Sequence, residues 1–267
     1  MELQVQGRRA YAYTGGKVFD PSLPCIAFVH GALHDHSVWN LLARWFAHHG
    51  HAVLAVDLPG HGRSEGPPLA TVEAIADWLL ALLDAAGAER AALAGHSMGS
   101  LIALETAARA PQRITRLALL ATAYPMKVSD ALLTTAGDDP LRAIDMVNAF
   151  SHSGIAAKPS FPGPGAWLHG ANRALMRRMQ AGGARDGNLF LTDFGVCDRY
   201  TNGLEAAAQV ACPATLVLGE RDQMTSPKAT REIAAALRAR SVMLPAGHSL
   251  MTEAPDALLG ALRSALG

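Results

Sequence analysis

The chain has 267 residues, enough for one large hydrophobic core with or without an inserted subdomain. Half of the residues are apolar, 17% are charged, and the 23 Lys and Arg residues balance the 23 Asp and Glu residues. Because there is neither a net charge nor a basic run, the composition argues against nucleic acid and anionic membranes as partners.

Two further features of the sequence bear on the cellular compartment in which the protein is expected to lie. The N-terminal segment lacks the apolar core of a signal peptide, and no apolar run approaches the roughly 20 residues that cross a bilayer. The three cysteines, Cys25, Cys197 and Cys212, are far apart and odd in number, which gives neither a disulfide framework nor a CxxC metal motif. We therefore expect a cytoplasmic protein with reduced thiols and no membrane partner.

Short apolar runs alternate with helical segments along the chain, which is typical of a parallel sheet covered on both faces by helices. Residues 3–14 form two short runs of alternating polar and apolar side chains and predict an antiparallel hairpin at the edge of the sheet. Six later runs predict buried strands, at residues 25–30, 52–57, 90–95, 116–121, 215–220 and 241–245. Together these runs predict an α/β fold with a mostly parallel, eight-stranded sheet.

Four segments between these strands have the apolar spacing of helices, and their ends carry start and stop signals. In residues 71–87, Thr71 is expected to act as the N-cap and Gly87 to end the helix. Residues 226–239 open on a serine N-cap with proline in the first turn. The other two predicted helices are residues 37–50 and 100–110.

The alternation breaks between about residues 123 and 207. This region has no strong β run, carries Gly- and Pro-rich turns at 158–165, and contains two helix-like pieces, residues 139–150 and 166–180. Because it separates two buried strands, we expect a mostly helical insertion over one edge of the sheet. The predicted core is then residues 1–122 and 208–267.

The pentapeptide GHSMG at residues 95–99 places Ser97 between two glycines, with a predicted strand before it and a predicted helix after it. This strand–turn–helix setting is the one that a nucleophile elbow requires. The turn forces its central residue into strained backbone angles, and the glycines remove side chains that would clash with neighbouring backbone. Ser97 would also lie at a helix N-terminus, whose partial positive charge favours a developing oxyanion.

A serine hydroxyl needs a base, and His248 is the histidine best placed among eleven. It lies on a Gly-containing loop after the last predicted strand, from which the chain can fold back over the strand ends beside Ser97. Asp222 lies just past the end of the preceding strand, where an acid can hold the imidazole in one tautomer. The order Ser97, Asp222, His248 is one of the known orders of a catalytic triad.

A further turn supplies candidates for an oxyanion hole. The segment VHGALHDHSVW at residues 29–39 follows a predicted strand with His-Gly, which bends the chain sharply. Backbone N–H groups just beyond that bend, above all that of Ala32, can point at the same place as the N–H of Met98. Two such donors would bind a tetrahedral oxyanion, and Ala32 and Leu33 would border the acyl pocket.

Five blocks of the chain, in this order, resemble the α/β-hydrolase superfamily. They are VHGALHDHSVW (29–39), VDLPGHGRSEGP (56–67), AGHSMGS (94–100), LGERDQMTSP (218–227) and AGHSLMTEAP (246–255). The resemblance implies Ser97 as the nucleophile, His248 as the base and Asp222 as the acid, with Ala32 and Met98 supplying the oxyanion hole.

The same resemblance implies that residues 123–207 are a helical cap, or lid, that shapes the substrate pocket. Methionine and aromatic side chains line the acyl site in related caps. The candidates here, with Gly31 and Leu33 from the first block, are Met126, Met146, Phe150, Trp167, Met176, Met179 and Phe190.

The nucleophile narrows the class of reaction that the resemblance implies. Relatives that act on haloalkanes or epoxides carry an aspartate where this chain has Ser97, and hydroxynitrile-lyase relatives tend to carry a lysine close after the acid, where this chain has Gln223. Carboxylesterases, lipases, thioesterases, lactonases, C–C-bond hydrolases, perhydrolases and acyltransferases remain, together with esterase-like signal receptors. We expect a carboxylesterase-like serine hydrolase acting on a small, apolar ester.

Two alternatives to the esterase hypothesis stay open. A C–C-bond hydrolase of ring-cleavage products acts on a substrate that carries a carboxylate, and it would use an anion-binding arginine such as Arg173, Arg177, Arg178 or Arg199. A ligand-sensing protein would keep the triad but turn over slowly.

Clustered histidines and one glycine-rich turn raise the question of a cofactor. The histidines at 34, 36, 48, 49 and 51 have no matching ligand set elsewhere in the chain. The turn at residues 57–62 lacks the Gly-Lys-Ser/Thr ending of a phosphate loop. We therefore expect no metal and no other cofactor.

Overall fold

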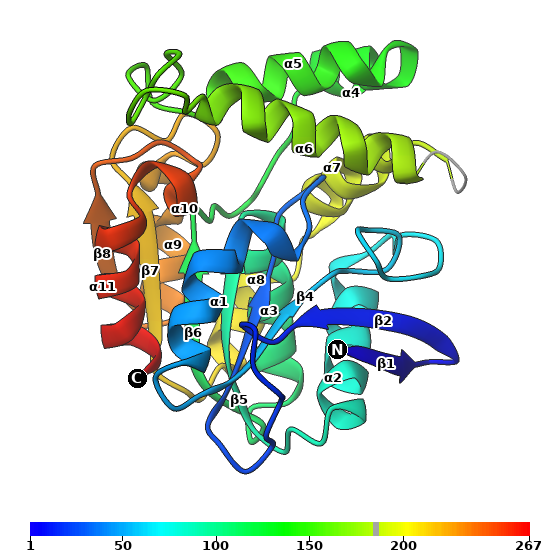
Figure 1. Ribbon diagram of the computed structural model, residues 1–267, viewed down its shortest axis with the longest axis vertical. Coiled ribbons are helices and arrows are strands. Elements are labelled where there is room, and N and C mark those ends of the chain that lie inside the picture. Colours follow the sequence, from blue (N-terminus) through cyan, green and yellow to red (C-terminus); the bar gives the residue numbers. More distant parts are fainter. Residues whose placement is uncertain (184–186) are drawn as a thin grey trace.

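The computed structural model describes residues 1–183 and 187–267, in which eight strands form one sheet with helices on both sides (Figure 1). The strand order is β1-β2-β4-β3-β5-β6-β7-β8; β1 and β2 pair antiparallel, β2 pairs antiparallel with β4, and the remaining neighbours are parallel. The strands are Glu2–Val5 (β1), Arg8–Tyr13 (β2), Cys25–Val29 (β3), Ala52–Val56 (β4), Ala91–His96 (β5), Ile114–Leu120 (β6), Ala214–Gly219 (β7) and Arg240–Leu244 (β8). The predicted α/β fold and all eight predicted strands are confirmed.

One strand differs from its expected environment. The run at residues 241–245 was expected to be a buried strand, but β8 is largely exposed because it forms the edge of the sheet and pairs only with β7. β3 lies inside the sheet and is buried along its whole length. Its successive side chains point to opposite faces, so Ile26 and Phe28 enter one apolar core while Ala27 and Val29 enter the other.

Two groups of helices cover these two faces. On the face of Ile26 and Phe28 lie His36–Trp39 (η1), Asn40–Ala47 (α1), Leu250–Glu253 (α10) and Pro255–Leu266 (α11). On the opposite face lie Val72–Ala85 (α2), Met98–Arg109 (α3), Gly203–Gln209 (α8) and Arg231–Ala236 (α9), the last preceded by Pro227–Thr230 (η2). The predicted N-caps are present, since Thr71 accepts a hydrogen bond from the Ala74 amide and Ser226 accepts one from the Lys228 amide.

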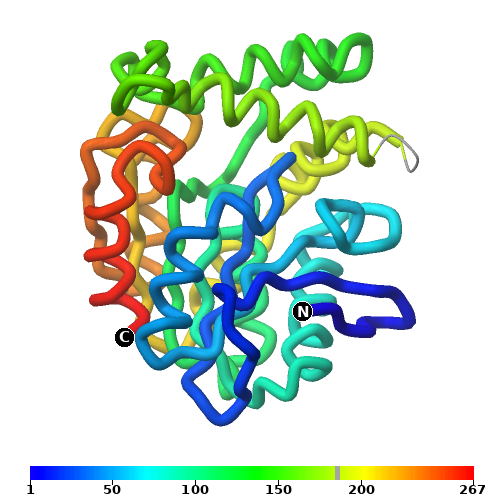
Figure 2. The backbone as a smooth tube through the Cα atoms, in the orientation of Figure 1, coloured from blue at the N-terminus to red at the C-terminus, as the bar shows by residue number. Residues whose placement is uncertain are grey.

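The segment between β6 and β7 leaves the sheet and lies across one end of it (Figure 2). It carries four helices that pack against one another, Asp130–Asp138 (α4), Pro140–Phe150 (α5), Leu168–Gly183 (α6) and Leu189–Arg199 (α7). These helices share a small apolar core of their own that includes Ile144, Met176 and Phe190. The next helix, α8, packs instead against α3, so the boundary expected at residue 207 falls inside an element that covers the sheet.

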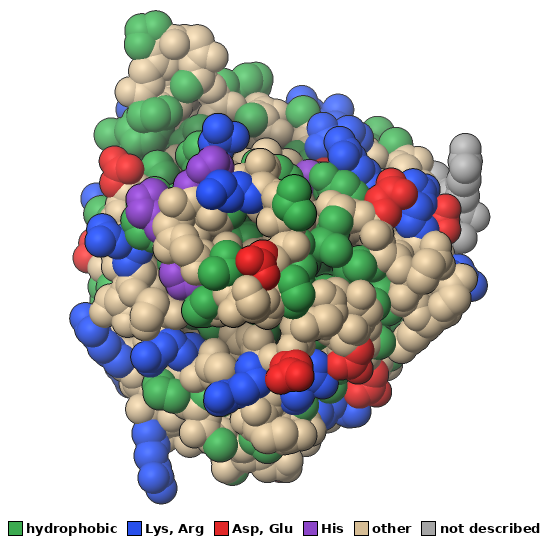
Figure 3. Space-filling model, turned by 60° about the horizontal axis from the view of Figure 1, so that its bottom comes forward, with side chains coloured by type: hydrophobic (Ala, Val, Ile, Leu, Met, Phe, Trp, Pro, Cys, Tyr) green, Lys and Arg blue, Asp and Glu red, His purple; other side chains and the backbone are tan. Residues whose placement is uncertain are grey.

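The surface on the side drawn in Figure 3 carries both basic and acidic side chains, as expected from the balanced composition. Across residues 1–183 and 187–267, the helices are all too short or too polar to cross a bilayer.

Candidate active site

Ser97 lies in a sharp turn between β5 and α3, with a φ of 53° and a ψ of −121°. This backbone conformation is rare for a residue with a side chain, and it is imposed by the close approach of the neighbouring chain segments. A Cβ atom on Gly95 would lie 2.0 Å from the carbonyl oxygen of Gly99, and one on Gly99 would lie 2.3 Å from the carbonyl oxygen of Val29. Both flanking positions therefore require glycine, and the turn has the form predicted for a nucleophile elbow.

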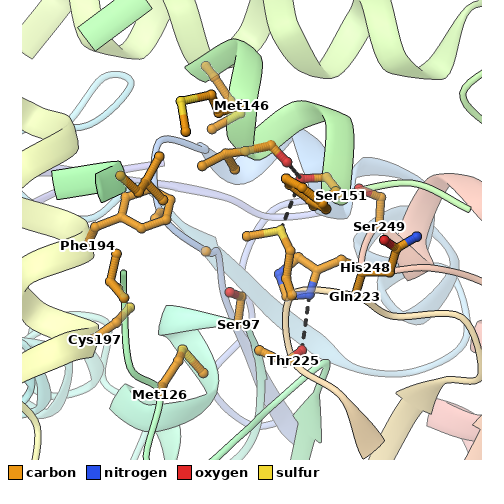
Figure 4. Close-up of a pocket in the computed structure, with 18 of the residues that line it drawn as sticks. Ser97, Met126, Met146, Ser151, Phe194, Cys197, Gln223, Thr225, His248 and Ser249 are labelled. Atoms are coloured by element: carbon orange, nitrogen blue, oxygen red, sulfur yellow. Dashed lines mark hydrogen bonds between the residues drawn. The ribbon is translucent and has the colours of Figure 1, made fainter. Parts of the chain in front are cut away.

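His248 is in direct contact with Asp222. Its imidazole lies close to Ser97 in the pocket (Figure 4). Asp222 follows β7, His248 follows β8, and the imidazole Nδ1 lies 2.9 Å from Asp222 Oδ2. Both residues are buried, with exposed fractions of 6% and 5%. The imidazole and Ser97 line the same cavity, as expected for a base and a nucleophile.

The Asp222 carboxylate is held by four donors. Its Oδ1 accepts hydrogen bonds from the amides of Met224 (2.8 Å) and Thr225 (2.9 Å), and its Oδ2 contacts the Thr225 hydroxyl (2.7 Å) as well as His248. Burial by itself would raise the pKa of Asp222, but the charge of His248 and these hydrogen bonds outweigh it and hold the pKa below its usual value. An ionised Asp222 fixes the proton of His248 on Nδ1 and leaves Nε2 as an acceptor.

His96, the residue before Ser97, holds the backbone of His248. Its Nε2–H donates a hydrogen bond of 2.9 Å to the His248 carbonyl oxygen, and its ring lies in the same cavity wall. Burial lowers the pKa of His96 well below its usual value, so this imidazole stays neutral. The Thr225 hydroxyl also lies 3.1 Å from Nδ1 of His248, 23 positions away in the chain, whereas His96 and His248 are 152 positions apart. The sequence predicted neither of these contacts.

The loop after β3 places the Ala32 amide near Ser97. The carbonyl oxygen of Gly31, which shares a peptide plane with that amide, accepts hydrogen bonds from His30 Nδ1 (2.8 Å) and from the His34 amide (3.3 Å). The His30 Nε2 accepts from the Leu58 amide, so the protons of this buried ring are fixed. Burial, the largest influence, lowers the pKa of His30 to about 4 and keeps the ring neutral.

The amides of Ala32 and Met98 have no protein acceptor within hydrogen-bond distance among the described residues. Free amides beside a strained serine are the groups that an oxyanion hole needs. The structure thus brings together the five positions singled out in the sequence at one end of the sheet.

A cavity of about 330 Å³ opens above Ser97, between the sheet and the inserted helices. Figure 4 shows Met146 and Phe194 on the insertion side of this cavity, opposite Ser97 and His248. Most of its wall is apolar: Ala32, Met126, Val128, Leu132, Met146, Val147, Phe150, Met176, Phe194, Cys197 and Met224. The wall has a second, polar part, in which His34 Nε2 lies 2.8 Å from Asn172 Oδ1.

Five of the nine pocket candidates named beyond the oxyanion hole line this cavity, namely Gly31, Met126, Met146, Phe150 and Met176. Leu33 does not, because its positive φ of 55° turns the side chain into the core of the inserted helices. Trp167 does not either, because it is 48% exposed, with its indole N–H donating to the carbonyl oxygen of Ala157. Met179 and Phe190 are also outside the wall, since both are buried between the inserted helices.

None of the four arginines proposed for anion binding lines the cavity. Arg173 and Arg177 both pair with Asp145, and Arg178 pairs with Asp35. Arg199 donates to the carbonyl oxygen of Ala70. Within residues 1–183 and 187–267, Lys127 is the Lys or Arg residue in the wall, and its ammonium donates to the carbonyl oxygen of Asp198.

The clustered histidines are dispersed in the structure. His34 belongs to the cavity wall, His36 lies 2.8 Å from Asp57, and His49 contacts the carbonyl oxygen of Trp45. Across residues 1–183 and 187–267, no three His, Cys, Asp or Glu side chains are arranged to hold a metal ion.

The fold and the arrangement around Ser97 define an α/β hydrolase, and the sequence comparison agrees. The profile described as the alpha/beta hydrolase fold matches residues 24–255, so the chain belongs to this family.

Among curated relatives, the chain is 44% identical over 72 residues to the dihydrolipoyllysine-residue acetyltransferase component of the acetoin cleaving system of Pseudomonas putida, which covers 27% of this chain and 20% of that protein. It is 33% identical over 126 residues to a lipase of Mycobacterium tuberculosis, covering 44% of this chain and 47% of that lipase. The matched part thus spans less than half the length of either relative.

Among solved structures, the enol-lactonase of Burkholderia xenovorans LB400 superposes with a TM-score of 0.84 at 24% identity, over 100% of this chain and 99% of that one. A hydrolase of Pseudomonas aeruginosa PA01 superposes with a TM-score of 0.77 at 25% identity, over 100% and 98%. The first likeness shows a shared fold and leaves the substrate undefined.

Proposed function

We propose that this α/β hydrolase is a serine hydrolase that cleaves small, apolar carboxylic esters through an acyl-enzyme. The observation that carries the proposal is the contact of 2.9 Å between His248 and a buried, ionised Asp222, beside a serine held in a strained turn. A serine hydroxyl becomes a nucleophile when an oriented base can take its proton.

In this mechanism Ser97 attacks the ester carbonyl while His248 Nε2 takes its proton. The resulting imidazolium is stabilised by Asp222 and passes the proton to the leaving alcohol. Water then attacks the acyl-enzyme, with His248 acting as base again, and releases the acid. The cycle uses only these side chains and water.

The negative charge on the carbonyl oxygen would be stabilised by the amides of Ala32 and Met98. Both belong to rigid parts of the backbone, since Met98 begins α3 and Ala32 lies next to the anchored carbonyl of Gly31. The N-terminus of α3 adds its partial positive charge. Donors that are fixed before the reaction cost no reorganisation when the charge develops.

The wall of the cavity supports an apolar ester as substrate. The acyl chain or the alcohol would contact methionine and aliphatic side chains from both the sheet side and the helices α4 to α7, which we propose form the cap. A C–C-bond hydrolase would need to hold a carboxylate, and this wall carries no guanidinium group among the described residues. The curated relatives include lipases, which supports an ester substrate.

The proposal is tested by replacing Ser97 with Ala and assaying nitrophenyl esters of increasing acyl length. We expect kcat to fall by at least about a thousandfold while the fold persists, because the nucleophile is lost and the turn is kept. Ser241→Ala, on the exposed edge strand β8, is the matched control and should retain full activity. A serine-directed phosphonate should label the wild type and the control but not Ser97→Ala.

Two results would contradict the proposal. Folded wild-type protein that hydrolyses no ester of the series and takes up no phosphonate would exclude a serine hydrolase. Thermal stabilisation by esters without turnover would favour a ligand-sensing protein in its place.

A further inference from the structure

One buried contact joins the inserted helices to the loop that carries the Ala32 amide. Asp193 of α7 accepts a hydrogen bond through Oδ2 from the backbone amide of Leu33, at 2.8 Å. The same oxygen lies 2.9 Å from Nε2 of His61, in the loop after β4. Asp193 and His61 are only 2% and 3% exposed, so this contact is shielded from water.

Leu33 needs such a partner because its backbone is strained. Its φ of 55° lies in the left-handed region, which a leucine rarely adopts without support from its surroundings. Among the described residues, Asp193 is the acceptor that the structure gives its amide. Without that acceptor a buried N–H group would be left unsatisfied, and the loop would be free to relax.

The position of Leu33 matters because its peptide group adjoins Ala32. The Ala32 residue lies between two peptide planes, one containing the Gly31 carbonyl and the other containing the Leu33 amide. His30 anchors the first plane through the Gly31 oxygen, at 2.8 Å, and Asp193 anchors the second. With both planes fixed, the direction of the Ala32 N–H is fixed as well.

His61 is a second donor to the Asp193 oxygen that accepts from the Leu33 amide. Burial would lower the pKa of His61, but the charge of Asp193 and their hydrogen bond outweigh burial and raise it. Its other nitrogen, Nδ1, lies 3.0 Å from the carbonyl oxygen of Pro59. The ring is thus held at both ends, and Asp193 has two donors on one oxygen.

We infer that Asp193 is a positioning residue for the oxyanion hole: a carboxylate from the inserted helices orients the Ala32 amide by holding the amide of Leu33. This role of Asp193 rests on the proposed function, since it concerns how the tetrahedral oxyanion is stabilised. The substrate-covering helices would then determine the rate of the chemical step as well as substrate binding.

The test compares Asp193→Ala, which removes the acceptor, with Asp193→Asn, whose amide oxygen can still accept from Leu33. For each variant, kcat and KM are measured on a nitrophenyl ester. Two ligands with the same alkyl group are also titrated, a boronic acid that becomes tetrahedral on Ser97 and a primary alcohol that only fills the cavity. The boronate places an oxygen where the oxyanion forms, so its affinity reports the state of the hole.

We expect Asp193→Ala to lower kcat and boronate affinity together, by about tenfold to a hundredfold. The Ala32 amide would remain but would point away from the oxyanion, so the effect should be close to that of losing one donor of the hole. KM and alcohol affinity should stay within about threefold of wild type, and Asp193→Asn should recover most of kcat and boronate affinity. His61→Gln is the control: its side-chain amide can still donate to Asp193, so the charge of the buried pair is lost while Asp193 still accepts from Leu33. This variant should lose stability and keep boronate affinity.

The inference would be overturned if Asp193→Ala kept its kcat and boronate affinity, or if His61→Gln lost them equally. If Asp193→Ala does not fold, combining it with His61→Leu removes the unpaired imidazole, and His61→Leu alone becomes the reference. A wild type that neither turns over the ester nor binds the boronate would be a failure of the proposed function, which these variants do not address.

Discussion

At the scale of single residues, the site depends on how completely Asp222 is hydrogen bonded. Two backbone amides occupy one carboxylate oxygen, while His248 and the Thr225 hydroxyl share the other. A carboxylate with this many donors is kept ionised and cannot rotate. Its negative charge therefore faces Nδ1 of the imidazole permanently.

Replacing Asp222 with Asn should test this arrangement. The amide oxygen can still accept from Met224 and Thr225, but the amide NH₂ would then face His248 and move its proton to Nε2. An imidazole protonated at Nε2 cannot take the proton of Ser97, so we expect kcat to fall by about 10³- to 10⁴-fold with little change in KM. The measurements are steady-state kinetics on a nitrophenyl ester, with circular dichroism to check the fold.

A fall of less than about tenfold would contradict the assigned role of Asp222. Glu220→Gln, an exposed acid at the end of β7, changes the same charge nearby and should leave kcat unaltered.

The sequence was informative about residues whose chemistry is tied to a local pattern. Ser97, Asp222 and His248 each follow a recognisable strand, and parallel strands bring their ends together at one edge of the sheet. His96 and Asp193 were missed because their partners are distant in the chain, 152 positions away for His96 and His248 and 160 for Asp193 and Leu33. The spacing of such residues in the sequence does not predict which loop they contact in the folded protein. Thr225 lies three positions from Asp222, but a threonine near an acid is too common in loops to mark a site.

At the scale of elements, the turn between β5 and α3 is set by backbone packing. Gly95 and Gly99 face each other across the turn, and the Gly99 backbone also approaches the end of β3. The strained angles of Ser97 follow from this packing, so the elbow is a property of two elements and one neighbouring strand.

Gly95→Ala should therefore be strongly destabilising. Its Cβ would lie 2.0 Å from a backbone oxygen that cannot move without displacing α3, and we expect a loss of about 3 kcal/mol or more in the free energy of unfolding. Gly260→Ala is the matched control, because this exposed glycine lies inside α11 with open space around its Cβ. The control should gain about 0.5–1 kcal/mol from the lower backbone entropy of alanine.

Urea unfolding followed by circular dichroism measures both variants. Equal stabilities for Gly95→Ala and the wild type would mean that the elbow is not packed as described.

Periodicity predicted the eight strands and six of the helical segments, because it reflects local burial, but it missed α4, α7, α8, α10 and α11. It also could not predict which side of an inserted helix faces the cavity. The four helices α4 to α7 bury residues against one another as well as toward the cavity, and both environments select apolar side chains. Met176 and Met179 belong to one helix and are both buried, yet only Met176 reaches the cavity wall. Trp167 was misplaced for a related reason, since a large aromatic residue can also lie on the surface.

At the scale of the whole molecule, the inserted segment is tied to both loops that carry the site. On the side of the Ala32 loop, Asn172 contacts His34 and Arg178 pairs with Asp35. On the side of the His248 loop, the Ser249 amide donates to the carbonyl oxygen of Ser151. Hydrogen bonds and ion pairs are directional, so these contacts favour one arrangement of the two parts.

This burial of polar groups makes stability depend on pH. Burial, the largest influence, lowers the pKa values of His30 and His34 to about 4 in the folded protein. In the unfolded chain each has a pKa of about 6.5, so the unfolded state binds more protons between pH 6.5 and 4. The free energy of unfolding should fall as pH drops through this window, at up to about 1.4 kcal/mol per pH unit for each ring.

Two other groups titrate outside that window and do not cancel the effect. The pKa of His61 is raised, so its contribution is complete below pH 6.5 and is lost as the pH rises through the folded value. The pKa of Asp222 is lowered, so its contribution is lost only in stronger acid, as the pH falls through the folded value.

Urea titrations at pH 7, 6 and 5 would measure this dependence. His34→Gln, whose amide can still donate to Asn172, should reduce the slope by up to about 1.4 kcal/mol per pH unit, because it removes one of the buried rings whose pKa is lowered. The rings of His30, His96 and His152, whose pKa values are also lowered, remain. A stability that is flat between pH 7 and 5 would contradict the neutral, buried state of these histidines.

The contacts between the inserted helices and the Ala32 loop bear on how this scaffold can be re-engineered. The helices α4 to α7, which we propose form the lid, invite exchange for those of a relative when a new substrate is wanted. An exchanged lid would remove three side chains that contact the Ala32 loop. They are Asp193, which accepts from the Leu33 amide, Asn172, which contacts His34, and Arg178, which pairs with Asp35. A chimera would therefore need these three side chains grafted back. Under the proposed function, the helices that set the substrate range and the loop that carries the oxyanion hole would not be separable modules.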